Sequence, residues 1–214
     1  LGQATWRCVA KNSFSVTRHK LRYFASRAAL NIEGLGPSTV DALLEKGLIS
    51  HYDDFFTLRE GDLLELDGFA EVSAKKLVDS IQNAVKQVPL HRLLTGLSLP
   101  HVGEETAILL AQNFNTIDDL SLASEEDLNA IIGIGPIVSK AIVLWFKDKE
   151  NKELVKRLKK VLIILAEKTS EKKNFPLAGK TFVLTGGMKS IGRDDAKERL
   201  LKLGANISSS VSKK

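Results

Sequence analysis

The feature that most constrains the fold of this chain is a short turn pattern that recurs four times at nearly constant spacing. Each copy has a small or polar residue, one apolar residue and then glycine or alanine, and the first positions lie 34, 33 and 32 residues apart. We call residues 34–36, 68–70, 101–103 and 133–135 turns 1 to 4. A period of this length is typical of helical units that stack into one core. Residues 29–146 are therefore predicted to form one domain of four such units.

Apolar spacing around the turns predicts helices, for example over 17–30 and 38–46, with Gly47 as a C-terminal stop. No segment between 17 and 165 alternates for long as a strand does, so this region is predicted to be all helical. The connectors 50–66 and 115–131 echo each other, each with an Asp-Asp pair and an acidic helix start. Four residues after each turn comes a residue of small or modest size, which lets helices pack closely; these are Val40, Ala74, Ala107 and Ser139.

The last part of the chain follows a different pattern. Residues 173–181 contain proline and glycine and are typical of a linker, and 180–187 is a β-branched and aromatic run that predicts a strand. Residues 193–203 have helical spacing with Gly204 as a stop, and 206–211 begins another predicted strand. The predicted fold class is therefore mainly α with tandem helical repeats, followed by a truncated α/β segment over 176–214.

Charge is unevenly distributed along the chain. Residues 1–30 hold six Lys and Arg and no acid, 147–173 hold ten against five acids, and 176–214 hold eight against three, whereas 31–146 hold seven against eighteen. The basic ends predict a polyanionic partner, and the acidic middle argues against simple electrostatic adhesion there. No apolar run approaches the ~20 residues that cross a bilayer, so no membrane partner is expected. The single Cys8 forms no internal disulfide, which favours a cytoplasmic setting.

A glycine turn before a helix is suited to bind phosphate, because the first backbone N–H groups of a helix are unpaired and lie at the positive end of its dipole. Glycine also lets an oxygen approach the backbone closely, and Pro37 and Pro136 suit a first helical position that needs no N–H. Such contacts hold a sugar-phosphate chain without reading its bases. The candidate DNA-binding residues are Gly34, Gly36, Gly68, Gly103, Gly133 and Gly135 of the turns, the hydroxyl residues Ser38, Thr39, Thr106 and Ser139, and the cations Arg22, Arg27, Lys75 and Lys140.

A purely structural or a nucleotide-binding role of the glycines fits the sequence less well. A single Gly-x-Gly between helices is usually a tight corner, but four copies at near-constant spacing argue against that for the set. A dinucleotide-binding loop needs a preceding strand and a third glycine, where this chain has Thr39. Residues 187–192 have the glycine spacing of a P-loop, but Arg193 and Asp194 follow where lysine and a hydroxyl residue are required.

The stretches IEGLG, LDGFAEVSAKKL, LPHVGEETAILLA and IIGIGPIVSKAI resemble helix-hairpin-helix motifs, the DNA-phosphate binders of repair and replication proteins. Their order and their residues are similar to those in the C-terminal half of the bacterial NAD-dependent DNA ligases. The stretch LRYFASRAALNIEGLG resembles the entry to the helix-hairpin-helix domain of that family. PLAGKTFVLTGGMKSIGRDDAKERLLKLGANISSSVSKK resembles the start of a BRCT domain. The resemblance implies a degenerate zinc-finger-like segment and entry helix over 1–28, four hairpin repeats over 29–146, a basic helix and linker over 147–175, and part of a BRCT domain over 176–214.

The resemblance also implies an activity. Members of this family seal nicks in duplex DNA during replication and repair, with NAD adenylating a lysine of a K-x-D-G motif. That motif does not occur in this sequence, so we expect no catalytic residue here and no activity from this chain alone. NAD and Mg²⁺ are expected to bind outside it. The expected role is to clamp nicked double-stranded DNA, as a monomer, in the cytoplasm at the nucleoid.

Two departures from the family pattern affect the expected site. The family carries a four-cysteine zinc finger, in which Cys8 matches the third ligand and the fourth would fall near Ser13. A normal zinc site is therefore not expected, and His19 is interpreted as an exposed helix residue rather than a substitute ligand. In turn 2, Ala70 stands where glycine is expected, which weakens the case for phosphate contact and leaves that turn with a structural role.

Two further functional classes stay open. A helix-hairpin-helix module of another repair protein would share the turns but not the PLAGKTFVLTG segment. A protein-interaction scaffold that binds no DNA would tolerate loss of the turn glycines.

Overall fold

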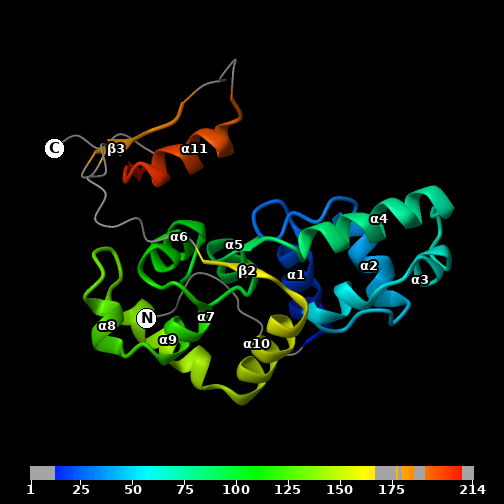
Figure 1. Cartoon of the computed structure of the whole chain (residues 1–214), viewed down its shortest axis with the longest axis horizontal. Helices are drawn as coiled ribbons and strands as arrows, with labels where there is room; N and C mark the ends of the chain where they lie inside the picture. Colours follow the sequence, from blue (N-terminus) through cyan, green and yellow to red (C-terminus); the bar gives the residue numbers. More distant parts are fainter. Residues whose placement is uncertain (1–12, 167–176, 178–179, 186–190, 209–214) are drawn as a thin grey trace, which may run out of the picture. The chain divides into compact units, whose positions relative to one another are not determined.

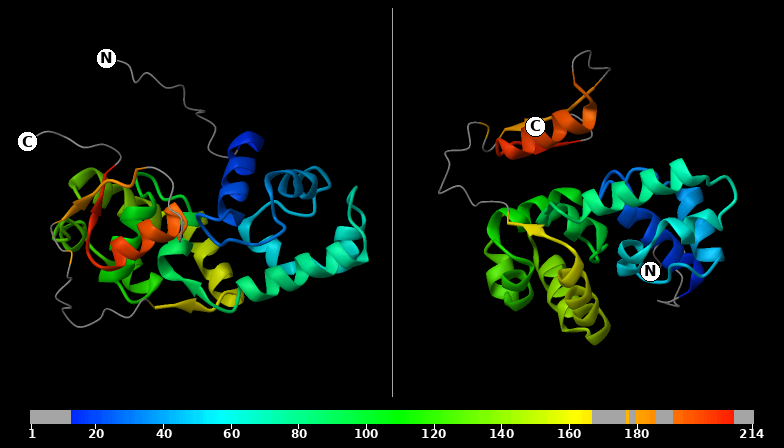
Figure 2. Two further views of the ribbon diagram at one scale, coloured as in Figure 1. Left: turned by 90° about the horizontal axis from the view of Figure 1, so that it is seen from above. Right: turned by 45° about the vertical axis from the view of Figure 1, so that its right-hand side comes forward.

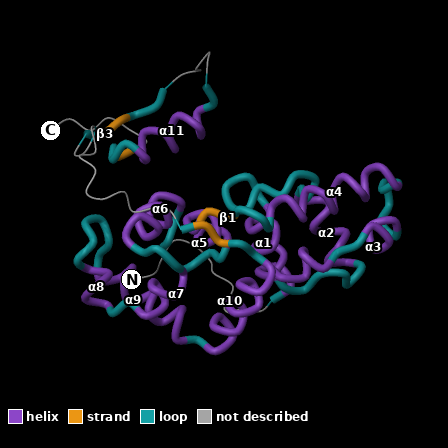
Figure 3. Tube along the Cα trace, viewed as in Figure 1, coloured by secondary structure: helices purple, strands orange, loops and turns teal. Residues whose placement is uncertain are grey.

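The computed structural model describes residues 13–166, 177, 180–185 and 191–208. The chain divides into two compact units, Leu1–Lys168 and Thr169–Lys214. Helices dominate the first unit (Figure 3), which confirms the mainly α class. The expectations for Cys8 and the rest of residues 1–12 lie outside the described residues.

The first unit consists of two runs of helices, which stay distinct in Figure 1 and in both views of Figure 2. The first run comprises α1 (Phe14–Ala25), α2 (Pro37–Glu45), the 3-10 helix η1 (Tyr52–Thr57), α3 (Glu60–Leu64) and α4 (Glu71–Ala84). The second run comprises α6 (Glu104–Asn113), α7 (Ile117–Leu122), α8 (Glu125–Asn129), α9 (Pro136–Lys147) and α10 (Lys149–Val161). Two elements connect the runs: α5 (Leu90–Gly96) packs against both α1 and α6, and α10 packs against both α9 and η1.

The repeat predicted from the sequence is present as packed helices. The residue four positions after each turn is fully buried, with an exposed fraction of 0% in every copy; these residues are Val40, Ala74, Ala107 and Ser139. All four belong to the hydrophobic core or its buried polar lining, and that core extends through both runs. A small side chain at this position therefore lets each helix approach its neighbours closely.

The echo between the connectors 50–66 and 115–131 also has a structural basis. In each connector two short helices have an aspartate at their third position, which accepts a hydrogen bond from the N-cap backbone N–H three residues earlier, at 2.7 to 3.0 Å. The pairs are Asp54 with His51, Asp62 with Arg59, Asp119 with Thr116 and Asp127 with Ser124. These carboxylates satisfy N–H groups that the helix leaves unpaired.

The helix predicted over 17–30 was placed too far along the chain. Helix α1 ends at Ala25, where the Ser26 hydroxyl donates to the Tyr23 carbonyl at 2.6 Å. The Leu30 N–H then donates to the Phe24 carbonyl at 3.1 Å, and Asn31 has φ of +51°. The chain therefore leaves the helix in a tight turn that buries Ala29 and Leu30 in the core.

The prediction that 17–165 is all helical missed a short parallel pair, β1 (Val88–Pro89) and β2 (Ile164–Leu165). The Val88 N–H donates to the Ile163 carbonyl at 2.9 Å, and the Ile163 N–H donates to the Val85 carbonyl at 2.8 Å. Two-residue strands are too short to show alternation in a sequence. The pair holds the segment after α10 against the entry to α5.

In the second unit, β3 (Thr181–Phe182) and β4 (Asn206–Ile207) pair in parallel and are connected through α11 (Arg193–Lys202). Strands were predicted over 180–187 and from 206, and the structure confirms both at these residues. Gly204 has φ of +84°, as its predicted role as a helix stop requires. Three predicted features lie outside the described residues: most of the linker, the GGMKS stretch at 186–190 and the strand beyond residue 208.

Candidate nucleic-acid interface

The first position of every turn has a left-handed backbone conformation. The φ angle is +89° at Gly34, +84° at Gly68, +63° at His101 and +101° at Gly133. Glycine adopts this region without steric cost, whereas other residues seldom do. The fold itself therefore accounts for glycine at the first position, so these glycines do not by themselves indicate a ligand.

The third position of each turn is different. Gly36, Gly103 and Gly135 are the N-caps of α2, α6 and α9 and have extended φ angles of −69°, −91° and −99°, which any residue adopts. A Cβ built on any of the three would meet no atom within 4 Å. Neither backbone conformation nor packing inside the chain requires glycine here. The space beside each of these N-cap residues, where a side chain would begin, is open. Ala70 adopts the same extended conformation in turn 2.

The first helical turns divide the four copies into two kinds. Helices α2 and α9 begin with proline and have no acid in their first turn. By contrast, α4 begins with Glu71, and α6 begins with Glu104 and Glu105. Carboxylates at these positions interact favourably with the positive end of the helix dipole. They therefore offset the positive potential that would otherwise attract an external anion. Turns 1 and 4 are therefore the two copies whose electrostatics suit a phosphate.

Each of these two turns is supported by a helix of the adjacent copy. A Cβ on Gly34 would lie 3.1 Å from Leu77 Cδ1 of α4, and a Cβ on Gly133 would lie 3.2 Å from Leu109 Cδ2 of α6. The copy that follows turn 1 thus packs against turn 1, and the copy that precedes turn 4 packs against turn 4. Helix α4, which follows turn 2, therefore supports turn 1, and helix α6, which follows turn 3, supports turn 4.

The hydroxyl residues predicted to bind DNA fall into two groups. Ser38 is exposed, and Thr39 and Thr106 are half-buried near the starts of their helices. Ser139, however, is fully buried, and its hydroxyl contacts the Asn129 side-chain oxygen at 2.5 Å and donates to the Gly135 carbonyl at 2.7 Å. The expectation of a DNA contact from Ser139 does not hold in this structure, because its position is a packing position of the repeat.

The predicted cations also differ in availability. Arg27, Lys75 and Lys140 are exposed. The Arg22 guanidinium contacts both carboxylate oxygens of Asp41, with Nε to Oδ1 at 2.7 Å. This hydrogen bond lowers the pKa of Asp41 and raises that of Arg22. Arg22 therefore joins α1 to α2 within the protein.

The basic helix α10 also uses cations internally. Arg157 Nε donates to Asp53 Oδ2 at 2.8 Å, and Lys159 forms an ion pair with Asp118. These two aspartates occupy equivalent places in the echoing connectors. Two cations of the basic segment predicted to contact a polyanion thus hold α10 against η1 in the first run of helices and against α7 in the second.

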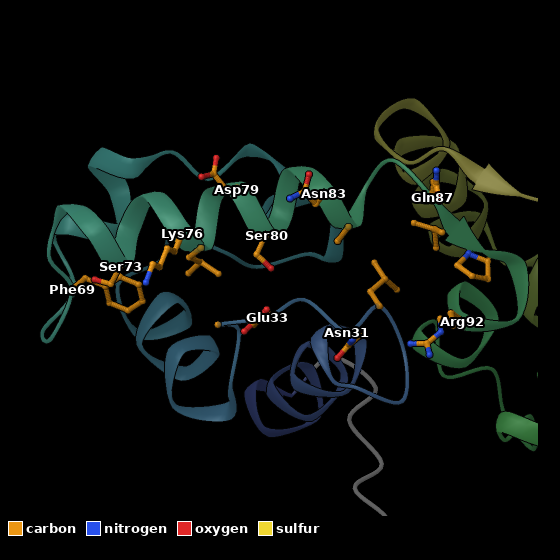
Figure 4. Close-up of a pocket in the computed structure, with 16 residues that line it drawn as sticks. Asn31, Glu33, Phe69, Ser73, Lys76, Asp79, Ser80, Asn83, Gln87 and Arg92 are labelled. Carbon is orange, nitrogen blue, oxygen red and sulfur yellow. The ribbon is translucent and has the colours of Figure 1, made fainter. Parts of the chain in front are cut away.

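A groove of about 970 Å³ extends from turn 1 along α4, and sequence reasoning did not identify it. Figure 4 shows Ser73, Lys76 and Ser80 of α4 on the side that faces Glu33, with Arg92 toward one end of the groove. The lining polar residues on α4 recur at helical spacing: Ser73, Lys76, Ser80 and Asn83. This helical spacing of polar residues is the sequence feature from which the groove could have been predicted. Glu33 and Asp79 also line the groove and balance Lys76 and Arg92, so it has no excess positive charge.

The described residues do not fit a zinc site. Ser13, near the expected fourth ligand, is the N-cap of α1, and its hydroxyl accepts from the Val16 N–H at 3.4 Å. His19 is exposed on the same helix. Within the described part of the chain, no group of three or more potential ligand side chains is placed to hold a metal ion. Among the same residues, no helix combines the length and apolar character needed to cross a membrane.

Three segments of the chain match known families. Residues 26–83 match the SAM-like helix-hairpin-helix tandem, residues 92–155 match the helix-hairpin-helix motif, and residues 172–214 match the BRCA1 C Terminus (BRCT) domain. These matches confirm the predicted hairpin repeats and the BRCT segment.

The whole chain is similar to curated proteins named DNA ligase. It is 44% identical over 207 residues to that of Chlamydia trachomatis serovar L2, which covers 97% of this chain and 31% of the relative. Identity is 38% over 216 residues with Halothermothrix orenii, covering 100% and 32% of the two chains. With Acidobacterium capsulatum it is 41% over 214 residues, covering 100% and 31%. The chain thus spans about a third of the length of these relatives.

Proposed function

Because this chain belongs to the DNA ligase family, we propose that it is the duplex-binding part of an NAD-dependent enzyme that seals nicks in DNA during replication and repair. It clamps the sugar-phosphate backbone near the nick through turns 1 and 4. Adenylation of a lysine by NAD, and the Mg²⁺ that supports it, belong to residues outside this chain, whose sequence has no K-x-D-G motif. The chain works as a monomer in the cytoplasm, at the nucleoid.

The observation that carries this proposal is the open space at the third turn position. Gly36 and Gly135 are not required by backbone conformation or by internal packing, and apart from their chain neighbours no atom of the described chain lies within 4 Å of where their Cβ would be. The helices behind them have no acid in their first turn. A phosphate oxygen can therefore reach the unpaired N–H groups of α2 and α9 at close range. This contact is local, so it is compatible with the acidic character of residues 31–146.

The exposed cations give this clamp additional charge. Lys140 lies one turn into α9 and Arg27 follows α1, and both are exposed. Contacts of this kind position a protein on a duplex without reading sequence. Binding is accordingly expected to weaken as salt rises, because each phosphate contact releases counterions.

The test is the double variant Gly36→Val with Gly135→Val, titrated against a fluorescent nicked duplex. Affinity should fall roughly tenfold or more, since a branched side chain would fill the space that the phosphate needs. Helical circular dichroism should be unchanged, because the extended backbone accepts valine. The matched control is Gly103→Val in turn 3, where Glu104 and Glu105 follow, and it should change affinity much less. Unchanged affinity in a folded double variant would refute the phosphate role of the turns.

Two outcomes would favour the alternative classes. Binding by the hairpins with no preference for nicked over intact duplex would favour a general helix-hairpin-helix module. No duplex binding by the wild-type chain would favour a protein-interaction scaffold. Similarity to proteins named DNA ligase over the whole chain, including the BRCT segment, supports the ligase proposal over both.

A further inference from the structure

Turn 4 carries two large apolar side chains on its outer surface. Ile132, just before the turn, is 95% exposed, and Ile137, at the second position of α9, is 74% exposed. Between them Ile134 points into the core and is 4% exposed. The pairs at the equivalent positions of the other turns each include an acid or a hydroxyl residue: Glu33 and Ser38, Asp67 and Val72, Pro100 and Glu105. Turn 4 alone has aliphatic residues at both positions.

These isoleucines flank the feature that suits turn 4 to an anion. Gly135 is the N-cap of α9, no atom lies within 4 Å of a Cβ built there, and α9 has no acid in its first turn. The outer surface of the turn therefore presents, in order along the chain, an apolar side chain, an open helix N-terminus and a second apolar side chain. Lys140 and Leu144 continue the exposed face of α9, because they lie three and seven residues beyond Ile137.

A DNA strand has a matching alternation, since each phosphate is flanked by two deoxyriboses whose C–H groups are apolar. We propose that Ile132 and Ile137 pack against the deoxyriboses on either side of the phosphate bound at turn 4. This inference rests on the proposed function and adds to it a contact surface driven by apolar burial. Aliphatic side chains of other DNA-binding proteins also contact DNA, although in the minor groove they insert between base steps instead of packing on the sugars.

The two kinds of contact differ in their dependence on salt. Phosphate neutralisation releases counterions and gives a steep slope of log affinity against log salt. Burial of aliphatic surface against a sugar releases no counterions. The isoleucines should therefore raise affinity by the same factor at every salt concentration, and for any base sequence, because every nucleotide offers the same sugar.

The experiment compares the wild-type chain with Ile132→Ser plus Ile137→Ser, titrated against a fluorescent nicked duplex at several salt concentrations. The double variant should bind about tenfold more weakly at each salt concentration, with an unchanged salt slope. Ile132→Val plus Ile137→Val should retain most of the affinity. Lys140→Gln provides the contrast, because loss of a phosphate contact should lower the slope by about one.

Two exposed aliphatic residues serve as matched controls. Val72, at the equivalent helix position after turn 2, is 68% exposed, and Leu122 in α7 is 84% exposed. Val72→Ser and Leu122→Ser should leave duplex affinity unchanged, since turn 2 carries Glu71 and α7 lies outside the turns.

Four results would overturn the inference. Wild-type affinity in the folded double-serine variant would show that the isoleucines do not contact DNA, while leaving the proposed function intact if the wild-type chain binds. A reduced salt slope in that variant would show a disturbed phosphate site instead of lost apolar contact. A change in sedimentation mass without a change in duplex affinity would assign the surface to protein association. Absence of duplex binding by the wild-type chain would defeat the proposed function as well.

Discussion

Gly96, the last residue of α5, lies directly against the ring of Phe24 in α1: a Cβ built on Gly96 would lie 2.9 Å from Phe24 Cδ2. It would also lie 3.2 Å from Ala29 Cβ, in the turn that follows α1. The Phe24 ring is in turn held by Tyr52 and Phe55, with ring centroids 4.6 and 6.3 Å away. Since α5 contacts both α1 and α6, this approach fixes one half of the repeat domain to the other.

Gly96→Ala should therefore destabilise the first unit. The added methyl group must displace the fully buried Phe24 ring, and overpacking of this kind costs about 1–3 kcal/mol. Urea unfolding of the full chain, followed by helical circular dichroism, measures the change. Gly61→Ala is the matched control, because Gly61 is a glycine in α3 with no atom within 4 Å of a built Cβ. It should be neutral or stabilising by up to about 1 kcal/mol, and equal effects at the two positions would contradict the packing argument.

Ser139 provides a second test, because the sequence and the structure assign it different roles. Its buried hydroxyl bonds to Asn129 and to the Gly135 carbonyl, and alanine already occupies the equivalent positions 74 and 107. Ser139→Ala should leave duplex affinity unchanged and cost at most about 1.5 kcal/mol of stability. Ser139→Leu should destabilise clearly, because the position is fully buried and the larger side chain would have to displace its neighbours. Loss of duplex affinity in a folded Ser139→Ala variant would show that this hydroxyl contacts DNA after all.

The parts of the fold that the sequence predicted correctly depend on local patterns. The turns, the small residue four positions later and the stop at Gly47 each follow from neighbouring residues. The end of α1 does not follow from neighbouring residues, because Ala28 and Ala29 favour a helix locally. The turn that buries Ala29 depends on its contact with Gly96, more than sixty residues away in the sequence. The β1–β2 pair escaped prediction for the same reason, since its two strands are far apart in the sequence and only two residues long.

The candidate site divides in a similar way. The sequence identified the turn glycines but could not separate their roles, because left-handed φ at Gly34 and open space at Gly36 are properties of the folded backbone. Arg22 was predicted to contact DNA because it belongs to a basic segment. Its pairing with Asp41, nineteen residues away, cannot be deduced from composition. The division of the turns by their first-turn acids, in contrast, was readable from the printed sequence.

Asp54, the third residue of η1, accepts several hydrogen bonds at the start of that helix. Its Oδ2 atom accepts from the Ser50 N–H and the His51 N–H, both at 2.7 Å, and from the Ser50 hydroxyl at 3.0 Å. Burial by itself would raise the pKa of Asp54, but these hydrogen bonds outweigh it and the pKa is lowered. A folded-state pKa below the unfolded value of about 3.9 stabilises the fold above that pH. This contribution is lost as the pH falls from about 4 through the lower folded-state pKa.

Asp54→Asn should consequently lower the urea midpoint at pH 7, and the gap from wild type should narrow below about pH 4. Both chains are unfolded in urea at a series of pH values between about 3 and 7, the range that brackets the ordinary pKa of an aspartate. Asp67, an exposed aspartate just before turn 2, supplies the control Asp67→Asn, which should follow the wild-type profile. A gap between Asp54→Asn and wild type that stays constant down to pH 3 would show that the hydrogen bonds do not depend on the charge of Asp54. In that case asparagine would lose packing alone, and the similar capping interaction that lowers the pKa of Asp127 would contribute little to acid sensitivity.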